Sequence, residues 1–412
     1  MKQGNHFKRL LGVVLGCVLG ISLYGTKCVF AAPPTSTGTE ANPAEVKIWK
    51  NIQMPVGVNT PAGTATFEFT SYKVDGATAT TTNMPVIPNR TITFTTGDTG
   101  DADTTAAGVR TVSKKSGNIL AGVTFPHAGE YLYHVKELAS GFTLANTTSL
   151  HETMEYSTKE YQVQVVVANN AANTGVYVQS ISVGVWNPVT STVGTKVNDT
   201  DHDEGVGFGF TNKFNRTHIG SPTDPSAALQ ISKSVSGSAG NTTEYFPFSL
   251  QVEDPTSVAV GMTTGTYKAI IVEGGVAVDP TNNGITGAGA DHSFSITAGA
   301  AFTFKLKHNQ SLAFIDLPVG ATYTVSETNA QGHTAYFKST SNGVAGTEAA
   351  GSTSGAAKYI TEGADIAAFR NNKDAATPTG ILINNLPYIL LIGFAGVVVL
   401  VVVNKKNKEE LA

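Results

Sequence analysis

Apolar residues in this chain alternate with polar ones or form short runs, and this pattern limits the chain to a fold built from β-strands. Segments such as "TATFEFTSY", "YQVQVVVA", "GVYVQSISVGVW" and "SFSITAGAAFTFKL" alternate or run apolar with β-branched and aromatic residues, and clusters of Gly, Asn, Asp and Thr separate them. Short strands at this spacing are typical of sandwiches. No amphipathic helix of useful length stands out, although residues 101–112 have room for one helical turn. The sequence therefore predicts an all-β fold.

The length of the chain indicates more than one sandwich. The 412 residues are too many for a single domain of this kind. A stretch rich in Pro, Ser and Thr, "NRTHIGSPTDPSAA", begins at residue 215 and is the best candidate for a linker. We therefore expect two tandem immunoglobulin-like domains, over residues 32–218 and 219–376.

An internal repeat supports this division, because three elements recur in the same order on both sides of the linker. They are an early strand with a lysine, a turn and strand that end in glutamate, and a strand that ends in Phe-x-Asn. The first set is Lys50 in "VKIWKNI", Glu137 in "FPHAGEYLYHVKE" and Asn212 in "FGFTN"; the second is Lys233 in "LQISKSV", Glu327 in "LPVGATYTVSE" and Asn371 in "AAFRN". Each expected domain thus has one Lys, one Glu and one Asn.

These residue types become reactive when they are buried together. The first and last strands of an immunoglobulin-like sandwich can lie side by side, which would bring Lys and Asn close to each other. Burial of an unpaired charge costs several kcal/mol, so it lowers the pKa of Lys and raises that of Glu. The neutral amine can then attack the Asn carbonyl carbon while the Glu carboxyl polarises the carbonyl and transfers protons. The expected product is a Lys–Asn isopeptide bond, formed with release of ammonia.

The amino terminus has the features of a secretory signal peptide. Lys2, Lys8 and Arg9 precede an apolar stretch, and small residues favour cleavage after Ala31. The only two cysteines, Cys17 and Cys28, lie within residues 1–31. The mature chain therefore has no thiol, which excludes disulfides, cysteine nucleophiles and Cys-ligated metals.

The carboxyl terminus combines a Pro-Thr-Gly motif, an apolar run over residues 386–403 and three lysines that follow it. The run approaches the ~20 residues that span a bilayer, and the lysines predict a cytoplasmic tail. The order resembles the sorting signal of Gram-positive surface proteins, with Thr377, Pro378, Thr379 and Gly380 in place of the commoner form that begins Leu-Pro. The resemblance implies that a membrane sortase cuts between Thr379 and Gly380. We expect residues 377–412 to form this signal, with Pro378 keeping Thr377 extended; a plain juxtamembrane linker is the alternative.

Taken with the two Lys, Glu and Asn sets, the chain is similar to the two-domain backbone (major) pilins of Gram-positive sortase-assembled pili, of the FctA or T-antigen type. The resemblance implies CnaB-type sandwiches in which Lys50 bonds Asn212 with Glu137 as catalyst, and Lys233 bonds Asn371 with Glu327. Lys47 and Asn372 are close enough in sequence to be rivals in a different register. Exposed Lys and Glu residues beside a chance Asn remain the alternative for either set.

The resemblance also implies partners and a location on the cell surface. The partners are a pilus-class sortase, with a housekeeping sortase as a further candidate, other copies of the chain, minor pilins, peptidoglycan and a host receptor that the sequence does not identify. Polymerisation needs an acceptor amine, and similar pilins have a lysine shortly before the Phe-x-Asn strand. Here "EGVGFGFTN" has none. Lys196, expected in a mobile exposed loop, is the nearest upstream candidate, and Lys213 is the reserve.

Other function classes have little support in the sequence. The net charge is −4 and becomes more negative once both termini are removed, which argues against nucleic-acid binding. Asp199, Asp201 and Asp203 have the spacing of a calcium loop, but Glu204 replaces the required Gly and Phe210 the bidentate Glu. No metalloprotease or G-x-S-x-G motif appears, so no cofactor and no enzyme activity beyond self-reaction are expected. A wall-anchored monomeric adhesin is the alternative function, and a surface enzyme ranks last.

Overall fold

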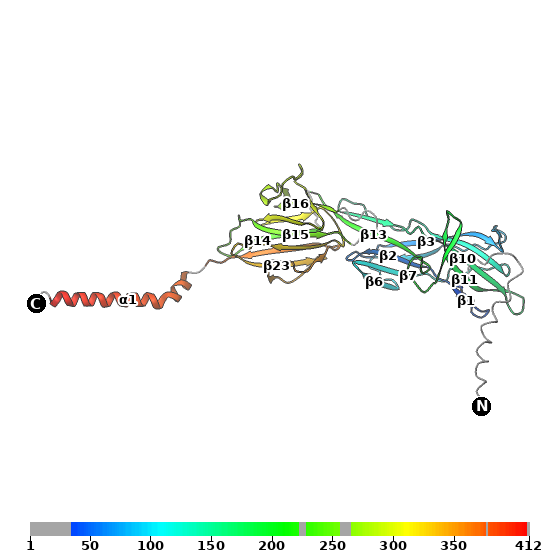
Figure 1. The fold of residues 1–412 in the computed structure, drawn as a ribbon, viewed down its shortest axis with the longest axis horizontal. Coiled ribbons are helices and arrows are strands. Elements are labelled where there is room, and N and C mark those ends of the chain that lie inside the picture. Colours follow the sequence, from blue (N-terminus) through cyan, green and yellow to red (C-terminus); the bar gives the residue numbers. More distant parts are fainter. Residues whose placement is uncertain (1–33, 222–227, 256–264, 376–377, 410–412) are drawn as a thin grey trace, which may run out of the picture. The chain divides into compact units, whose positions relative to one another are not determined.

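The computed structural model describes residues 34–221, 228–255, 265–375 and 378–409 of the chain. These residues form two compact units, with the boundary between Thr217 and His218, and a separate carboxyl-terminal helix (Figure 1). The expected signal peptide lies outside the described residues, as does Thr377 of the sorting motif. Both units consist of β-strands, so the predicted all-β class is confirmed.

The first unit is a sandwich of two sheets. One sheet has the order β1-β11-β10-β8-β3-β4, with β12 beside β11 and β5 beside β3; the other has the order β13-β2-β7-β6, with β9 beside β13. The strands are β1 (Ser36–Thr37), β2 (Trp49–Pro55), β3 (Gly63–Val74), β4 (Ala77–Thr78), β5 (Arg90–Phe94), β6 (Ala102–Ala106), β7 (Val109–Lys115), β8 (Gly129–Glu137), β9 (Leu150–Glu155), β10 (Glu160–Asn169), β11 (Val176–Asn187), β12 (Thr192–Val197) and β13 (Gly209–Ile219).

Aromatic side chains from both sheets form the core of this unit. The rings of Phe67 on β3 and Phe210 on β13 lie 5.0 Å apart between their centroids, and Tyr161 on β10 contacts Phe210 edge to face at 5.1 Å. All three side chains are fully buried. Such ring pairs contribute stability beyond the area that they bury, and they fix the distance between the sheets.

The second unit repeats this arrangement. Its larger sheet has the order β17-β16-β20-β14-β27-β23-β24, with β18 beside β16 and β25 beside β23, and its smaller sheet has the order β19-β15-β22-β26. The elements are β14 (Leu229–Ser236), β15 (Phe246–Glu253), β16 (Thr266–Glu273), β17 (Val276–Val278), the 3-10 helix Thr281–Asn283, β18 (Phe294–Thr297), β19 (Ala301–Leu306), β20 (Gln310–Phe314), β21 (Asp316–Pro318), β22 (Thr322–Glu327), β23 (Thr334–Ser341), β24 (Val344–Ala345), β25 (Ala349–Ala350), β26 (Lys358–Tyr359) and β27 (Asp365–Asn372). Phe248 on β15 packs against Phe369 on β27 across the core.

Two local expectations were wrong. Residues 101–112 form the hairpin of β6 and β7 and contain no helical turn. The hairpin turns at Ala107 and Gly108, which both have positive φ (49° and 82°), as a two-residue type I′ turn requires. The expected linker is also shorter, because β13 continues to Ile219; residues 222–227 of that stretch lie outside the described part of the chain.

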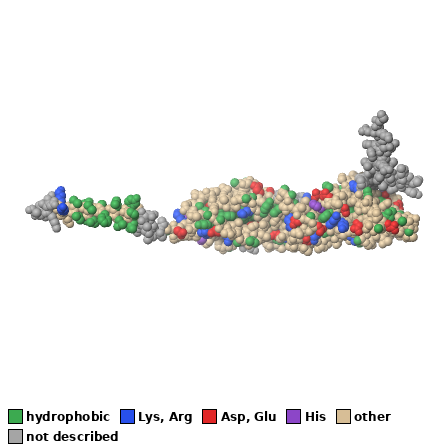
Figure 2. All heavy atoms as spheres, turned by 90° about the horizontal axis from the view of Figure 1, so that it is seen from below, with side chains coloured by type: hydrophobic (Ala, Val, Ile, Leu, Met, Phe, Trp, Pro, Cys, Tyr) green, Lys and Arg blue, Asp and Glu red, His purple; other side chains and the backbone are tan. Residues whose placement is uncertain are grey.

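Helix α1 (Pro378–Glu409) contains a stretch, Asn385–Lys406, that is long and apolar enough to cross a membrane. Its apolar side chains are exposed in the structure, with lysines beyond them (Figure 2). This helix fits the transmembrane segment of a sorting signal. It begins at Pro378, so the backbone of Pro378, Thr379 and Gly380 forms its first turn. The extended conformation expected for Thr377 lies outside the described residues. Proline is compatible with both conformations, because a helix leaves its first N–H groups unpaired.

Candidate functional site: two buried lysine, glutamate and asparagine clusters

The core of the first unit contains Lys50, Glu137 and Asn212 in direct contact. Lys50 Nζ donates to Glu137 Oε2 at 2.9 Å, and Asn212 Nδ2 donates to Glu137 Oε1 at 2.8 Å. One carboxylate thus bridges the amine and the amide. The side chains of Lys50 and Glu137 have no exposed surface, and Asn212 is fully buried as well.

Strand pairing accounts for this arrangement. β2 and β13 are parallel neighbours, with Lys50 opposite Phe210 and Asn212 two residues further along β13. Phe210 and Asn212 are two residues apart on β13, so their side chains point to the same face of the sheet. Lys50, opposite Phe210, points to that face as well, and this face is the core. Glu137 comes from β8 in the facing sheet. The cluster therefore joins the two layers of the sandwich.

The second unit has the same arrangement in the same register. β14 and β27 are parallel, Lys233 lies opposite Phe369, and Asn371 follows two residues later. Lys233 Nζ and Asn371 Nδ2 donate to Glu327 Oε1 at 2.8 and 2.7 Å. All three side chains are buried.

The two clusters differ in how the carboxylate is used. In the first unit each oxygen of Glu137 accepts one bond, whereas in the second unit Glu327 Oε1 accepts both and Oε2 has no partner among the described residues. Lys233 Nζ also lies 4.2 Å from the centroid of the Phe246 ring, a cation–π distance. The surroundings of Lys233 are thus more aromatic and less polar.

Burial changes the acidity of these groups. Desolvation lowers the pKa of Lys50 from its usual 10.5 to about 8, although Glu137 and Glu204 favour the charged amine. It lowers the pKa of Lys233 to about 8 as well, although the hydrogen bond that Lys233 donates to Glu327 favours the charged amine. Desolvation also raises the pKa of Glu137. Both lysines are therefore much easier to deprotonate than a lysine in water.

This geometry is suited to amide exchange between side chains. A deprotonated lysine is a nucleophile, and the Asn side-chain amide is an electrophile with ammonia as its leaving group. Glu137 contacts both the attacking and the departing nitrogen, so its carboxyl can take a proton from one and give a proton to the other. It does not contact Asn212 Oδ1, so the polarising role expected for Glu137 has no contact to support it.

The rival residues lie elsewhere. Lys47 is only half-buried. Asn372 accepts a hydrogen bond from Ser236 Oγ and donates one to Asp374, away from Glu327. The register of β2 and β14 thus directs Lys50 and Lys233 inward, as the sequence pattern predicted.

Lys196 differs from its expected setting. It lies on β12, paired with Gly184 of β11, and not in a loop. The residue is half-buried, and partial desolvation lowers the pKa of its amine. The reserve, Lys213, lies on β13 and forms an exposed ion pair with Glu155 at 3.6 Å.

The acidic loop before β13 has a structural role in the first unit. Asn198 Oδ1 accepts from the backbone N–H groups of Thr200 and Asp201, and Asp201 Oδ1 accepts from that of Asp203, so hydrogen bonds within the loop hold its shape. No group of His, Cys, Asp or Glu in the described ranges has the geometry of a metal site.

Two residues near the first cluster, Ser157 and Glu204, were not predicted from the sequence as part of the site. The backbone N–H of Ser157 donates to Asn212 Oδ1 at 2.9 Å, and Glu204 accepts from Ser157 Oγ, also at 2.9 Å. A backbone donor has no sequence signal. Glu204 did have a sequence signal, since it occupies a position where a calcium loop requires glycine.

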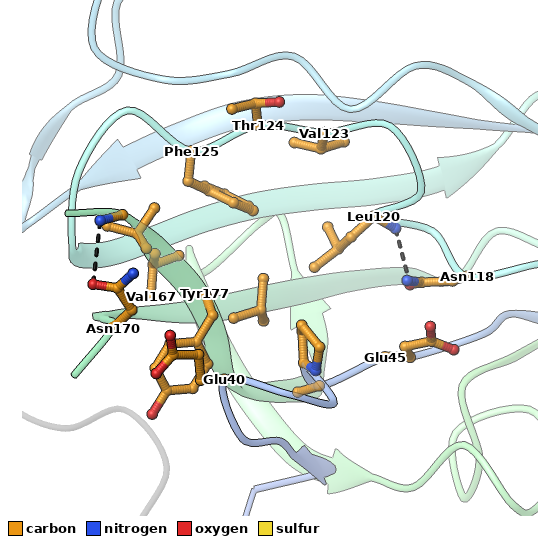
Figure 3. Close-up of a pocket in the computed structure, with 15 residues that line it drawn as sticks. Glu40, Glu45, Asn118, Leu120, Val123, Thr124, Phe125, Val167, Asn170 and Tyr177 are labelled. Atoms are coloured by element: carbon orange, nitrogen blue, oxygen red, sulfur yellow. Dashed lines mark hydrogen bonds between the residues drawn. The ribbon is translucent and has the colours of Figure 1, made fainter. Parts of the chain in front are cut away.

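A surface pocket of about 440 Å³ lies elsewhere on the first unit. Leu120, Phe125 and Val167 supply apolar surface, and Glu40 and Glu45 supply carboxylates (Figure 3). None of the three clustered residues of this unit lines it. The buried cluster therefore has no opening through this pocket.

Comparison with family models assigns each unit separately. Residues 46–215 match FctA, described as a Spy0128-like isopeptide containing domain. Residues 227–371 match DUF7601, a domain of unknown function. The comparison with curated proteins gave no match.

Solved structures similar to the chain include pilus proteins. The major pilin from Streptococcus pyogenes is 20% identical, with 81% of this chain and 100% of that chain covered and a TM-score of 0.33. The major pilin protein (T3.2) from Streptococcus pyogenes serotype GAS13637 is 19% identical, with 80% and 98% covered and a TM-score of 0.31. The pilus-presented adhesin Spy0125 (Cpa) is 14% identical, with 80% and 100% covered and a TM-score of 0.25.

Proposed function

Because residues 46–215 carry a Spy0128-like isopeptide-containing domain, the domain type of the T-antigen backbone pilins, we propose that this protein is the structural subunit of a covalently polymerised cell-surface pilus. The observation that carries the proposal is the pair of buried Lys, Glu and Asn clusters in identical register. Each would become a Lys–Asn isopeptide bond between the first long strand and the last strand of its unit. Glu137 and Glu327 would catalyse this self-reaction.

The carboxyl terminus gives the proposed route to the cell wall. Helix α1 holds the precursor in the membrane, and a sortase cuts between Thr379 and Gly380 and joins Thr379 to an amine. A pilus-class sortase would use an amine on another copy of this chain or on a minor pilin. A housekeeping sortase would finally use an amine of peptidoglycan. The assembled fibre would support adhesion to a host receptor.

Polymerisation of the proposed fibre also needs an acceptor amine. Lys196 remains our candidate for two reasons. It lies on β12, which pairs only with β11 among the described strands, and the pKa of its amine is lowered. A lowered pKa leaves more of the amine in its nucleophilic form. Lys213 is the reserve.

Intact mass spectrometry tests the isopeptide bonds. The secreted part, residues 32–379, is expected to be two ammonia molecules lighter than its sequence mass. A protein of full sequence mass would show that the isopeptide bonds do not form and would contradict the proposal.

Cell-wall extracts test polymerisation and anchoring. A ladder of high-molecular-weight bands is expected on a blot, whereas a single anchored species would favour the monomeric adhesin. Mature material should end at Thr379 joined to an amine, and recovery of the "VVVLVVV" segment in purified wall material would contradict sortase cleavage.

Replacement of one lysine tests the acceptor. In cells that carry Lys196→Ala, we expect the ladder to disappear while the monomer stays anchored. Lys136→Ala, which removes an exposed lysine of β8, is the matched control, and Lys213→Ala tests the reserve. An unchanged ladder in the Lys196 variant would show that another lysine links the fibre.

A further inference from the structure

The amide oxygen of Asn212 has a hydrogen-bond donor that its counterpart lacks. The backbone N–H of Ser157 donates to Asn212 Oδ1 at 2.9 Å. Since an N–H can donate only to the oxygen of the amide, this bond also turns Asn212 Nδ2 toward Glu137. In the second unit, Asn371 Oδ1 is buried and has no partner within the described part of the chain.

Ser157 is fixed by contacts to the strand that carries Asn212. It lies between β9 and β10, and its Oγ donates to Glu204 Oε2 at 2.9 Å. The same oxygen of Glu204 accepts from the backbone N–H of Thr211 at 2.5 Å. Thr211 directly precedes Asn212. Glu204 therefore ties the segment that holds the donor to the residue beside the acceptor.

The region around Glu204 is itself held by a buried tyrosine. Tyr161 Oη accepts from the backbone N–H of Gly205 at 3.0 Å and donates to the carbonyl of Gly209 at 2.6 Å. The Tyr161 side chain is fully buried. The donor is thus positioned before any reaction begins, which is the condition for electrostatic catalysis.

The proposed reaction places negative charge on the atom that this donor contacts. When Lys50 Nζ attacks Asn212 Cγ, a C–N bond forms and the carbonyl electron pair moves onto Oδ1. The proton lost by Nζ passes through the Glu137 carboxyl to Nδ2. The Cγ–Nδ2 bond then breaks, the electron pair on Oδ1 re-forms the carbonyl, and ammonia leaves. The balance is one amine plus one amide giving one amide plus ammonia.

We propose that the backbone N–H of Ser157 is the oxyanion donor for bond formation in the first unit and that Glu204 is its positioning residue. This inference rests on the proposed Lys50–Asn212 reaction. The second unit reacts without such a donor. It therefore provides a reference reaction inside the same molecule.

The first test removes the N–H alone. Unreacted chains of residues 32–379 are recovered unfolded from inclusion bodies, checked for full sequence mass and refolded. Samples taken over time are analysed by intact mass and by mapping of the cross-linked peptides. With Ser157→Pro, bond formation in the first unit is expected to slow by roughly a hundredfold, the usual effect of losing one oxyanion donor. The second unit should react at its normal rate.

Ser157→Ala is the matched control, because it keeps the N–H and loses only the hydroxyl. We expect this variant to react faster than Ser157→Pro. If Ser157→Pro folds, as judged by circular dichroism, and forms the first bond at the wild-type rate, the proposal is wrong.

The second test applies even if the proline variant does not fold. Glu204→Ala removes the acceptor for Ser157 Oγ, whereas Glu204→Gln keeps an acceptor oxygen without the charge. The charge of Glu204 raises the pKa of Lys50, so a purely electrostatic role predicts that both variants react faster than wild type. A positioning role predicts that Glu204→Ala is slower than Glu204→Gln. Equal rates in the two variants would overturn the role of Glu204 and of the donor that it holds.

Measurements on the wild-type chain distinguish failure of the isopeptide proposal from failure of the oxyanion-donor proposal. If neither unit loses ammonia, the isopeptide proposal fails and the oxyanion donor fails with it. If both units lose ammonia but the Ser157 and Glu204 variants match the wild type, only the present inference fails.

Discussion

Lys50 and Lys233 occupy positions where a permanent positive charge would be costly. Each is fully buried and contacts a single carboxylate. A buried ion pair of this kind contributes little net stability, because desolvation offsets most of the attraction. Conversion of the amine into an amide would remove both charges from the core. The residues are therefore better explained by the proposed bond than by the ion pair.

Removal of either glutamate should leave the corresponding bond unformed. We expect Glu137→Ala and Glu327→Ala each to restore the mass of one ammonia, because no other carboxyl contacts the two nitrogens in the described residues. Intact mass with peptide mapping measures this. Glu68→Ala, which removes an exposed carboxylate paired with Lys136, is the control and should keep both bonds. Loss of both ammonia molecules in the Glu137 variant would exclude its catalytic role.

Bond formation should speed up as the pH rises toward 8. The pKa of Lys50 in the folded chain is about 8, below its usual 10.5. Below that pH most of the amine is protonated and cannot attack, and the reactive fraction grows about tenfold per pH unit. Above that pH the gain should level off. Refolding at a series of pH values, followed by intact mass, measures the rate, and a rate that falls between pH 6 and pH 8 would contradict this ionisation.

Among the elements, the parallel pairs β2 with β13 and β14 with β27 determine which strands the proposed bonds would connect. Each pair joins the first long strand of a unit to its last strand. A bond between them closes a loop that contains most of the unit. By analogy with a disulfide, such a loop of more than about 100 residues stabilises the fold by roughly 5 kcal/mol through the unfolded state.

Asn212→Ala should therefore destabilise the first unit strongly. We expect a loss of roughly 5 kcal/mol in its free energy of unfolding, from the missing cross-link. Urea unfolding followed by fluorescence measures the change. Asn169→Ala, at the exposed end of β10, is the control and should unfold like the wild type. An Asn212 variant with the same urea midpoint as the control would mean that the cross-link does not stabilise the unit.

On the scale of the whole molecule, the sequence predicted the architecture and the clusters because both follow from periodic patterns. Alternation identified the strands, and the repeated Lys, Glu and Asn positions indicated which faces point inward. What it missed depends on contacts between residues far apart in the sequence. Lys196 was expected in a loop, although pairing with Gly184 places it on a strand.

The remaining differences have local physical causes. The contribution of Ser157 is a backbone N–H, which every residue except proline has, so no side chain marks it. Pro378 fits the first turn of a helix as well as an extended segment, and its sequence could not distinguish them. The proposed cleavage after Thr379 would require a sortase to unwind that turn.

The intact subunit should also show its cross-links on a denaturing gel. We expect Lys50→Ala/Lys233→Ala to migrate more slowly than wild type, because its denatured chain has no closed loops. A reducing agent should change neither, since Cys17 and Cys28 precede the expected cleavage site. The control Lys47→Ala/Lys338→Ala removes the same charge and should migrate like wild type. Equal migration of the two double variants would contradict the cross-links.

The burial of each cluster gives the proposed bonds one more property. Strands β2, β8 and β13 must all be in place before Lys50 and Asn212 meet, so a chain that has never folded keeps its full mass. Once the bond has formed, denaturant separates the sheets but does not return the ammonia. The mass of an old subunit would therefore record how many of its units have ever reached the native state, a molecular history that reversible contacts cannot store.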